Sequence, residues 1–318
     1  MAEPPAKRHQ AEHPSWAVAA GTVPGKIGFA NAGQSCYLNA ALQMILQMPE
    51  LFNGDFLNPE NVQFLYSLSR LRQTSAKHVV ISHAIVVAWM NKNLPAHLRY
   101  QGAQGDAHEV LIALLDVIDQ NGGRDRIKKH LNGTQRNMTT CSSCHVVSTR
   151  DESFTQLTVP FTGGNEVRIE SFFAGMFRSE VLDGANMYQC DTCKTQRVAT
   201  RTVEIARFPQ YLLIQVLRFD QERKMHNPFV FAHRVSGDKR GDPIFQLQGF
   251  VVHEGASQDR GHYITYGAVQ MDTENPFKSK WMLYNDSRCT EVSAEFLGSE
   301  VVQRNIYVLL FKRTGTVM

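Results

Sequence analysis

The hydrophobic period of this chain changes part-way along it, and that change limits the fold more than any other feature. In the first half, apolar residues recur at helical spacing in two segments, one from Cys36 to just before Pro49 and one over residues 106–120. In the second half, short segments alternate or run continuously apolar between Gly, Asp and Asn clusters, which is typical of strands. The predicted strands cover residues 157–161, 211–219, 245–253, 262–269, 281–285 and 305–312. Helices followed by strands indicate an α+β fold.

Composition excludes several functional classes. The chain has 318 residues, of which 43% are hydrophobic and 20% charged, as in a soluble globular protein. A formal net charge of +3 argues against binding driven by nucleic-acid phosphates. No apolar run approaches the roughly 20 residues of a membrane span, and the flanks of Trp16–Ala20 are unlike a signal peptide. We therefore expect an intracellular monomer, in the cytoplasm or nucleus, that binds neither nucleic acid nor membrane.

The six cysteines divide into two groups. Four form two Cys-x-x-Cys pairs, Cys141/Cys144 and Cys190/Cys193, while Cys36 and Cys289 stand alone. In a reducing compartment, paired spacing suggests a metal and a lone cysteine suggests catalysis. Two such pairs can close a tetrahedral zinc site. A disulfide framework and four free thiols are the alternatives.

A candidate nucleophile lies at the start of the first predicted helix. Cys36 follows a glycine-punctuated loop, and the positive end of a helix dipole stabilises a thiolate. Free cysteine is also a common buried hydrophobe, so position alone leaves both readings open. The same is true of His262, which opens a strand after Gly261, and of Asn285 and Asp286, which by themselves form an ordinary turn.

These segments together resemble the cysteine and histidine boxes of the ubiquitin-specific proteases. The matching positions are Gly28, Asn31, Gly33, Cys36, Tyr37, Asn39, Leu42 and Gln43, then Gly261, His262, Tyr263, Tyr266, Trp281, Asn285 and Asp286. Two intermediate segments, 104–110 and 213–219, also resemble family motifs. The resemblance runs from about Gly25 to Lys312 and implies a papain-like cysteine protease with a helical thumb, a β-rich palm and zinc-ribbon-like β fingers.

The resemblance also implies an organisation and an activity. Residues 1–24 would be a flexible arm, and 25–318 the catalytic domain, with a thumb at about 25–135, fingers at about 136–200 and a mainly palm segment at about 201–318. The reaction would be hydrolysis of the peptide or isopeptide bond after the C-terminal glycine of ubiquitin, through a thioester. A protease for another ubiquitin-like modifier, or a pseudoenzyme that only binds ubiquitin, is the alternative.

Residue roles follow from the matched positions. Cys36 would be the nucleophile, His262 the base and Asn285 the group that orients it. Asn31 would help to hold the oxyanion, or would only brace the glycine loop. In a strand leading out of Trp281, Asn285 and Asp286 would point to opposite faces. The family pattern implies that the second of these polar residues, Asp286, lies near the oxyanion side.

Substrate-binding positions are implied in the same way. Gln104, Asp106 and Glu109 would hold the extended tail of ubiquitin, whose arginines suit carboxylates. Helix capping is the alternative role of Asp106 and Glu109. Tyr263 would line the same narrow channel, with Gly255 and Gly261 allowing a close approach.

The resemblance also implies a zinc site, and a few residues differ from the family's usual pattern. The paired cysteines match the tips of the family's β fingers, so we expect one structural zinc held by Cys141, Cys144, Cys190 and Cys193, and no cofactor for catalysis. Gln34-Ser35, Ala40 and Val110 depart from the family's usual residues, but none of these changes removes a catalytic group.

Overall fold

The helices of the first half pack into one layer around a common core. The computed structural model describes residues 17–19, 26–53, 59–75, 77–161, 166–220, 223–237, 240–257 and 260–318. The helices of this layer are α1 (Cys36–Ile45), α2 (Pro59–Thr74), α3 (His83–Asn93), α4 (Ala107–Ile118) and α5 (Arg124–His130), with short turns η1 (Pro49–Phe52), η2 (Ala96–Leu98) and η3 (Asp119–Gly123). All ten residues of α1 are buried, so this helix runs through the centre of the molecule.

The ends of α1 and α4 follow from local chemistry. α1 ends at Ile45, before Pro49 begins the turn η1. At α4, Asp106 is the N-cap residue and its carboxylate accepts the backbone N–H groups of His108 and Glu109. α4 ends in a kink where Gly122 has φ 94°, a conformation that glycine adopts without strain. Both helices predicted from the sequence are confirmed.

A large sheet forms the second layer. Its strands follow the order β20-β19-β18-β17-β21-β12-β6, with β16 paired to β17. Their bounds are β6 (Gln156–Pro160), β12 (Tyr211–Leu217), β16 (Arg234–Ser236), β17 (Pro243–Ser257), β18 (Arg260–Gln270), β19 (Lys280–Asn285), β20 (Arg288–Val292) and β21 (Ile306–Thr316). These strands confirm the six strand predictions and the α+β class.

The sheet is buried on both faces. On β12, Tyr211 and Leu213 belong to the core shared with the helices, while Leu212 and Ile214 belong to a second core on the other face. The second core is covered by α6 (Ile169–Met176), η6 (Glu295–Gly298) and α7 (Glu300–Asn305). Burial on both faces explains why β12 reads as a continuous apolar run.

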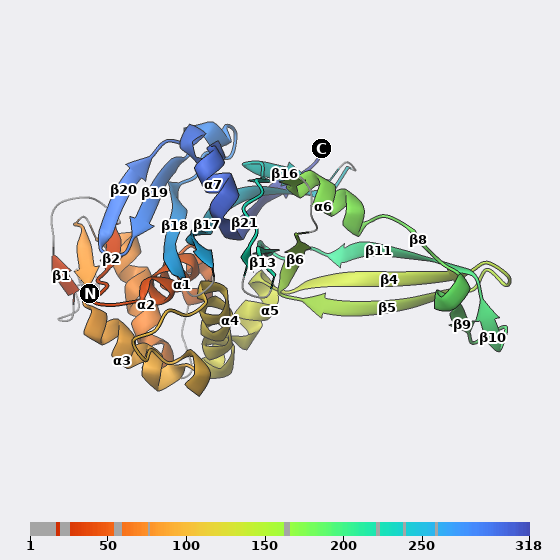
Figure 1. The fold of residues 1–318 in the computed structure, drawn as a ribbon, viewed down its shortest axis with the longest axis horizontal. Helices are drawn as coiled ribbons and strands as arrows, with labels where there is room; N and C mark the ends of the chain where they lie inside the picture. The colour runs from red at the N-terminus through yellow and green to blue at the C-terminus, as the bar shows by residue number, and fades with distance from the viewer. Residues whose placement is uncertain are drawn as a thin grey trace, which may run out of the picture.

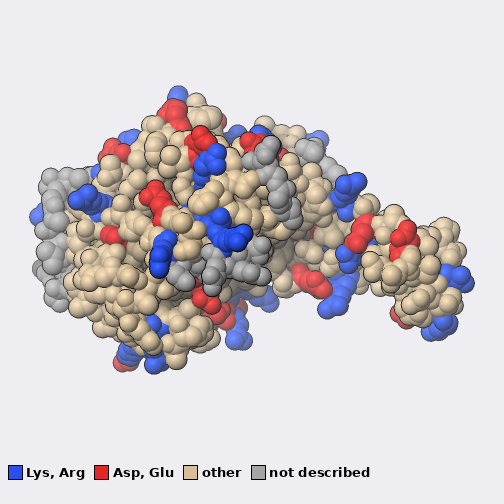
Figure 2. All heavy atoms as spheres, viewed as in Figure 1, with Lys and Arg blue, Asp and Glu red and all other residues tan. Residues whose placement is uncertain are grey.

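A narrow sheet extends away from these two layers (Figure 1). Its strands follow the order β5-β4-β11-β8, and a separate hairpin, β9-β10, lies at its far end. The bounds are β4 (Gly133–Cys141), β5 (Val147–Phe154), β8 (Glu180–Leu182), β9 (Tyr188–Cys190), β10 (Thr195–Arg197) and β11 (Ala199–Arg207), with η4 (Gly184–Asn186) between β8 and β9. Basic and acidic side chains are interspersed on the face of the molecule seen in Figure 2.

Smaller elements complete the fold. They are β1 (Ala17–Ala19), β2 (Ile27–Phe29), β3 (Val79–Ile81), β7 (Val167–Arg168), β13 (Phe219–Asp220), β14 (Arg223–Lys224), β15 (Phe229–Val230) and η5 (Pro276–Lys278). The predicted arm over residues 1–24 lies outside the described residues except for β1, which pairs with β3. Within the described ranges, no helix has both the length and the apolar character that crossing a membrane requires.

Candidate active site

Cys36 is the first residue of α1 and faces the large sheet. Its side chain is buried, with 3% of the residue exposed. The preceding residue, Ser35, occupies the N-cap position, but its side chain makes no capping hydrogen bond. The N-terminal N–H groups of α1 and the positive end of its dipole therefore lie beside the thiol without a side-chain acceptor from Ser35.

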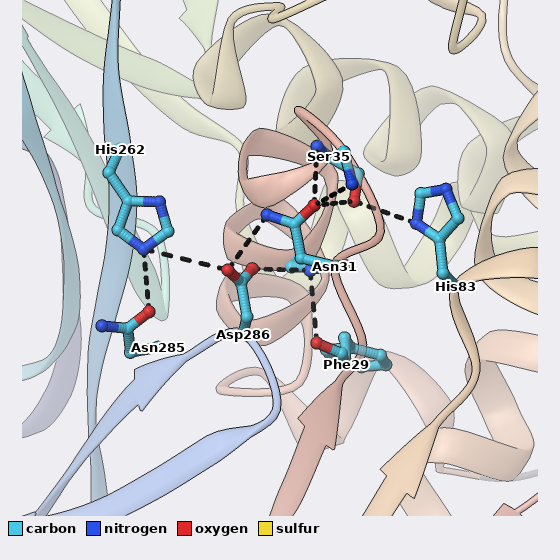
Figure 3. A network of polar contacts seen from close by, with 9 residues as sticks. Phe29, Asn31, Ser35, His83, His262, Asn285 and Asp286 are labelled. Atoms are coloured by element: carbon cyan, nitrogen blue, oxygen red, sulfur yellow. Dashed lines mark hydrogen bonds and ion pairs between the residues drawn. The ribbon is translucent and has the colours of Figure 1, made fainter. Parts of the chain in front are cut away.

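His262 and Asn285 come from neighbouring strands and meet opposite Cys36. His262 lies on β18 and Asn285 is the last residue of β19, which pairs with β18. Nε2 of His262 lies 2.8 Å from Oδ1 of Asn285 (Figure 3). The neighbouring Cys36 thiol raises the pKa of His262 to about 9, against the opposing effect of burial, and the bond with Asn285 adds to the rise. This arrangement favours a protonated imidazole beside the sulfur.

Asp286 converges on the same imidazole nitrogen. β19 ends at Asn285, and Asp286 has φ 52°, a left-handed conformation that Asp tolerates better than most residues. The turn brings Oδ2 of Asp286 to 3.9 Å from Nε2 of His262. The expectation that Asn285 and Asp286 point to opposite faces assumed a continuing strand, and the strand stops one residue earlier.

The carboxylate of Asp286 is held by two amides from the cysteine segment. Its Oδ1 accepts the side-chain N–H of Asn39 at 2.7 Å, and its Oδ2 accepts that of Asn31 at 3.0 Å. Asn39 also donates to the carbonyl of Phe29. Asp286 therefore ties the turn after β19 to the loop before α1 (Figure 3).

Backbone contacts bring the same two segments together. The N–H of Phe29 donates to the carbonyl of Asp286 at 2.9 Å. A Cβ on Gly28 would lie only 2.4 Å from the carbonyl oxygen of Ser287. Only glycine permits this approach, so Gly28 sets the distance between the cysteine segment and the turn that carries Asn285 and Asp286.

Asn31 braces the glycine loop in the way that the sequence left as an alternative. Its Oδ1 accepts the backbone N–H groups of Gly33 and Ser35 and the Ser35 hydroxyl. An amide group carries two hydrogens on nitrogen, and within the described part of the chain one of these is committed to Asp286. The oxyanion role of Asn31 stays a prediction.

The three predicted tail-binding residues lie at one side of the centre. Oε1 of Gln104 accepts the backbone N–H of Gly261 at 3.2 Å, directly before His262. Asp106 caps α4 and also accepts the hydroxyl of Tyr307 at 2.5 Å, whereas Glu109 is exposed. Asp106 and Glu109 line a pocket of about 280 Å³ together with His108, Gln215, Leu217, Arg218, Phe219 and Tyr307. Helix capping by Asp106 is thus observed, and tail binding stays a prediction.

Tyr263 lies behind the site. Only 1% of it is exposed, and its ring packs 4.6 Å from that of His253 and 6.1 Å from that of Tyr307, measured between centroids. His253 is fully buried, and burial together with nearby Lys224 lowers its pKa to about 4. Its side chain is therefore neutral near pH 7. Tyr263 supports the wall of the site, and its predicted place along the substrate channel stays a prediction.

The four paired cysteines form a cluster at the tip of the narrow sheet. Their sulfur atoms all lie within 4.8 Å of one another, and those of Cys144 and Cys190 are 3.6 Å apart. Zinc–sulfur bonds of about 2.3 Å in a tetrahedron place sulfurs about 3.8 Å apart, which this cluster fits. Backbone N–H groups, first that of Cys144, lower the pKa of Cys141 to about 6, whereas, against a backbone hydrogen bond, burial and the three neighbouring thiols raise the pKa of Cys144 to about 12.

The two halves of the cluster share one local geometry. Cys141 ends β4 and Cys190 ends β9, and in each case the residue after the second cysteine has positive φ, 55° at His145 and 56° at Lys194. Each of these residues donates its N–H to the carbonyl of the first cysteine of its pair. Two matching turns therefore present four sulfurs to one point.

Cys289 and His83 stand apart from the predicted set. Burial raises the pKa of Cys289 to about 12, which keeps this thiol protonated. His83, at the start of α3, lies 3.1 Å from the hydroxyl of Ser35 and was not indicated by any sequence pattern. A pairing between residues 48 positions apart leaves no local signal.

Most of the chain is similar to known proteins. A family model described as ubiquitin carboxyl-terminal hydrolase matches residues 27–311. Ubiquitin carboxyl-terminal hydrolase 25 of Arabidopsis thaliana is 25% identical, over 91% of this chain and 47% of the relative. Ubiquitin carboxyl-terminal hydrolase Usp2 of Drosophila melanogaster is also 25% identical, over 91% of this chain and 35% of the relative. The chain thus spans less than half the length of these two relatives.

Solved structures share the fold. The SAGA Ubp8/Sgf11/Sus1/Sgf73 DUB module bound to ubiquitin aldehyde contains a chain that superposes with a TM-score of 0.72 at 19% identity, covering 93% of this chain and 71% of that one. The same module bound to monoubiquitin gives a TM-score of 0.71 at 20% identity, covering 94% and 72%. At these identities the likeness concerns the fold.

Proposed function

Because the chain belongs to the ubiquitin carboxyl-terminal hydrolase family, we propose that it is a deubiquitinase that hydrolyses the bond after the C-terminal glycine of ubiquitin. The resemblance to the ubiquitin-specific proteases is confirmed, as is the fold of helical thumb, β-rich palm and β fingers. We further propose thumb, fingers and palm limits at about 25–135, 136–200 and 201–318.

One observation supports this activity most strongly. His262 engages Cys36 and Asn285 at once, and the contact with the sulfur raises the pKa of the imidazole. A nucleophile, a base and an orienting group in contact are the arrangement that nucleophilic catalysis needs. A pseudoenzyme would need none of these contacts.

The reaction proceeds in two halves. In the first, the Cys36 thiolate attacks the carbonyl carbon of the C-terminal glycine, and the oxygen gains negative charge. The His262 imidazolium gives its proton to the leaving amine, the carbon–nitrogen bond breaks and a thioester forms. In the second, His262 takes a proton from water and the hydroxide attacks the thioester carbon. The carbon–sulfur bond breaks, the Cys36 thiolate is restored beside the His262 imidazolium, and the product carboxylic acid gives its proton to solvent and leaves as the ubiquitin carboxylate.

Asn31 and Asp286 serve the oxygen that becomes negative in both halves. The second hydrogen on Nδ2 of Asn31 and the backbone N–H groups at the start of α1 would donate to it, and Asp286 holds the Asn31 amide in place. Removal of one such donor typically costs about 100- to 1,000-fold in rate. Asn285 fixes the ring orientation of His262 without adding charge.

The tail of ubiquitin would lie along the pocket that Asp106 and Glu109 line, with Gln104 and Tyr263 forming the wall nearer His262. Glu109 is exposed and available to a basic side chain. Carboxylates pair well with arginine in such a groove.

Zinc would be held by Cys141, Cys144, Cys190 and Cys193 at the tip of the fingers, where the sulfur positions fit a tetrahedral ion. Bound zinc supplies structural cross-linking there and takes no part in the hydrolysis. All six cysteines are free, which suits a compartment that keeps thiols reduced, such as the cytoplasm or nucleus. We propose that the chain acts as a monomer.

A panel of modifier probes tests this function. Ubiquitin and several ubiquitin-like modifiers, each carrying a C-terminal electrophile, are incubated with the protein, and the adduct is mapped by mass spectrometry. We expect ubiquitin to label Cys36 and the Cys36→Ala variant to remain unlabelled. Labelling by a different modifier alone would identify a different substrate class, and the absence of any labelling would contradict the proposed activity.

A further inference from the structure

The hydroxyl of Ser35 is used in an unusual way for a helix N-cap. Serine at this position normally accepts an N–H from the first turn of its helix. Here the residue is completely buried, and its Oγ makes no capping bond. Instead it lies 3.0 Å from Oδ1 of Asn31 and 3.1 Å from Nδ1 of His83.

Proton accounting gives these two contacts a direction. A serine hydroxyl has one hydrogen, and the amide oxygen of Asn31 can only accept. The Ser35 hydrogen therefore goes to Asn31, and Nδ1 of His83 must carry a hydrogen and donate it to Ser35. The donors run from His83 through Ser35 to Asn31, and Figure 3 shows His83 and His262 on opposite sides of this loop.

This chain of donors fixes which way the Asn31 amide faces. Its Oδ1 receives the Ser35 hydroxyl together with two backbone N–H groups, so the oxygen points toward α3 and the nitrogen toward Asp286. A flipped amide would place its own N–H groups against those donors. The orientation seen here is the one that offers a donor to the reacting oxygen.

The start of α1 is affected as well. The same two contacts hold the Ser35 side chain in an orientation in which its oxygen makes no capping bond to the first turn.

His83 is itself held firmly in place. It is the first residue of α3, whose N-cap Ser82 accepts the N–H of Ile85. Its ring meets the ring of Tyr100 edge-on, with centroids 5.2 Å apart. The hydroxyl of Tyr100 in turn accepts the N–H of Gln34 at 3.3 Å. His83 and Tyr100 therefore contact the loop before α1 from the side opposite His262.

We propose that His83 is a positioning residue of the active site, which acts through Ser35 to aim the Asn31 amide at the oxyanion. The inference rests on the proposed function, in which Asn31 binds the oxyanion. Among the described residues, His83 meets Ser35 and Tyr100, and it belongs to none of the matched family motifs.

Two variants of His83 separate the donor from the ring. His83→Phe keeps an aromatic ring against Tyr100 but removes the donor, whereas His83→Asn keeps an N–H near the place of Nδ1. For a ubiquitin C-terminal amide reporter, we expect His83→Phe to lower kcat about tenfold, which is about 1.4 kcal/mol, and to leave KM unchanged. His83→Asn should restore most of kcat.

Alkylation of Cys36 by iodoacetamide distinguishes positioning from a general loss of structure. Alkylation forms no oxyanion, so its rate should stay within about twofold of wild type in His83→Phe while kcat falls. In an Asn31→Ala background, the His83→Phe change should have little further effect, because both act on one donor.

The outcomes divide clearly. A wild-type protein that does not hydrolyse the reporter overturns the proposed function. If wild type is active, an unchanged kcat in His83→Phe, equal losses in kcat and alkylation, or full additivity with Asn31→Ala overturns the inference. Should His83→Phe fail to fold, Ser35→Ala, which leaves His83 and Tyr100 packed together, carries the same expectations.

Discussion

Substitution of Gly28 by Ala should disable the site from a position that touches neither substrate nor triad side chain. The added Cβ would lie 2.4 Å from the carbonyl oxygen of Ser287, 2.7 Å from its carbon and 2.9 Å from its Cα. All three are backbone atoms, so no side-chain rotation relieves the clash. The oxygen alone falls about 1 Å short of the 3.4 Å at which ordinary van der Waals contact begins.

The backbone shift that the added Cβ forces has a definite direction. It must separate the cysteine segment from the turn after β19, where the N–H of Phe29 bonds to the carbonyl of Asp286 and the Asp286 carboxylate holds Asn31 and Asn39. A misplacement of about 1 Å can cost about 100-fold in rate. We therefore expect kcat/KM for a ubiquitin C-terminal reporter to fall by about that factor.

Gly175→Ala is the matched control. Gly175 lies in α6, and a Cβ there would meet nothing within 4 Å, so alanine should leave activity unchanged and slightly stabilise the helix. Thermal unfolding of both variants checks folding separately. Gly28→Ala with wild-type kcat/KM would show that the approach of the two segments does not set the geometry of the site.

Three further predictions concern the metal, the turn and the base. Cys141→Ser should lower the zinc content of the purified protein, which we expect to be about one ion per chain in wild type, and should lower the melting temperature. Cys289→Ser should keep the zinc content of wild type. A metal-free wild-type protein of full stability would contradict the zinc site. Asn285→Ala should reduce reporter turnover without abolishing it, and Asp286→Ala should be at least as damaging because it releases Asn31; unchanged turnover in both would place the orienting group elsewhere. Because the pKa of His262 is raised to about 9, its protonated form contributes stability to the folded protein that is complete below about pH 6.5 and is lost as pH rises through 9. The value of kcat/KM should fall over the same alkaline range. A flat profile of kcat/KM from about pH 8 to 10 would refute the assignment of His262.

The sequence predicted the elements whose patterns are local. The helix at Cys36 carries apolar residues at helical spacing and ends before Pro49, and β12 is apolar on both faces, so each pattern is recognisable within about ten residues. α2 gave no comparable signal, because its mean hydropathy is low and its apolar residues form no strong stripe.

The site was predicted as a set of residues rather than as a geometry. Resemblance to family motifs brought Cys36, His262 and Asn285 together as a predicted triad; in the structure His262 bonds to Asn285, and Cys36 raises the pKa of His262. The left-handed turn at Asp286 decided where its carboxylate points, and a strand pattern carries no information on that dihedral angle. His83 reaches the loop from another helix, so its part depends on packing alone.

Turnover by the Cys36→Ala variant tests the central claim most directly. The account makes the Cys36 thiolate the sole nucleophile, so this variant should show no hydrolysis of a ubiquitin C-terminal reporter while it still binds ubiquitin in a direct binding assay. Appreciable hydrolysis by correctly folded Cys36→Ala would contradict the assignment of Cys36, and with it the catalytic roles given to His262 and Asn285.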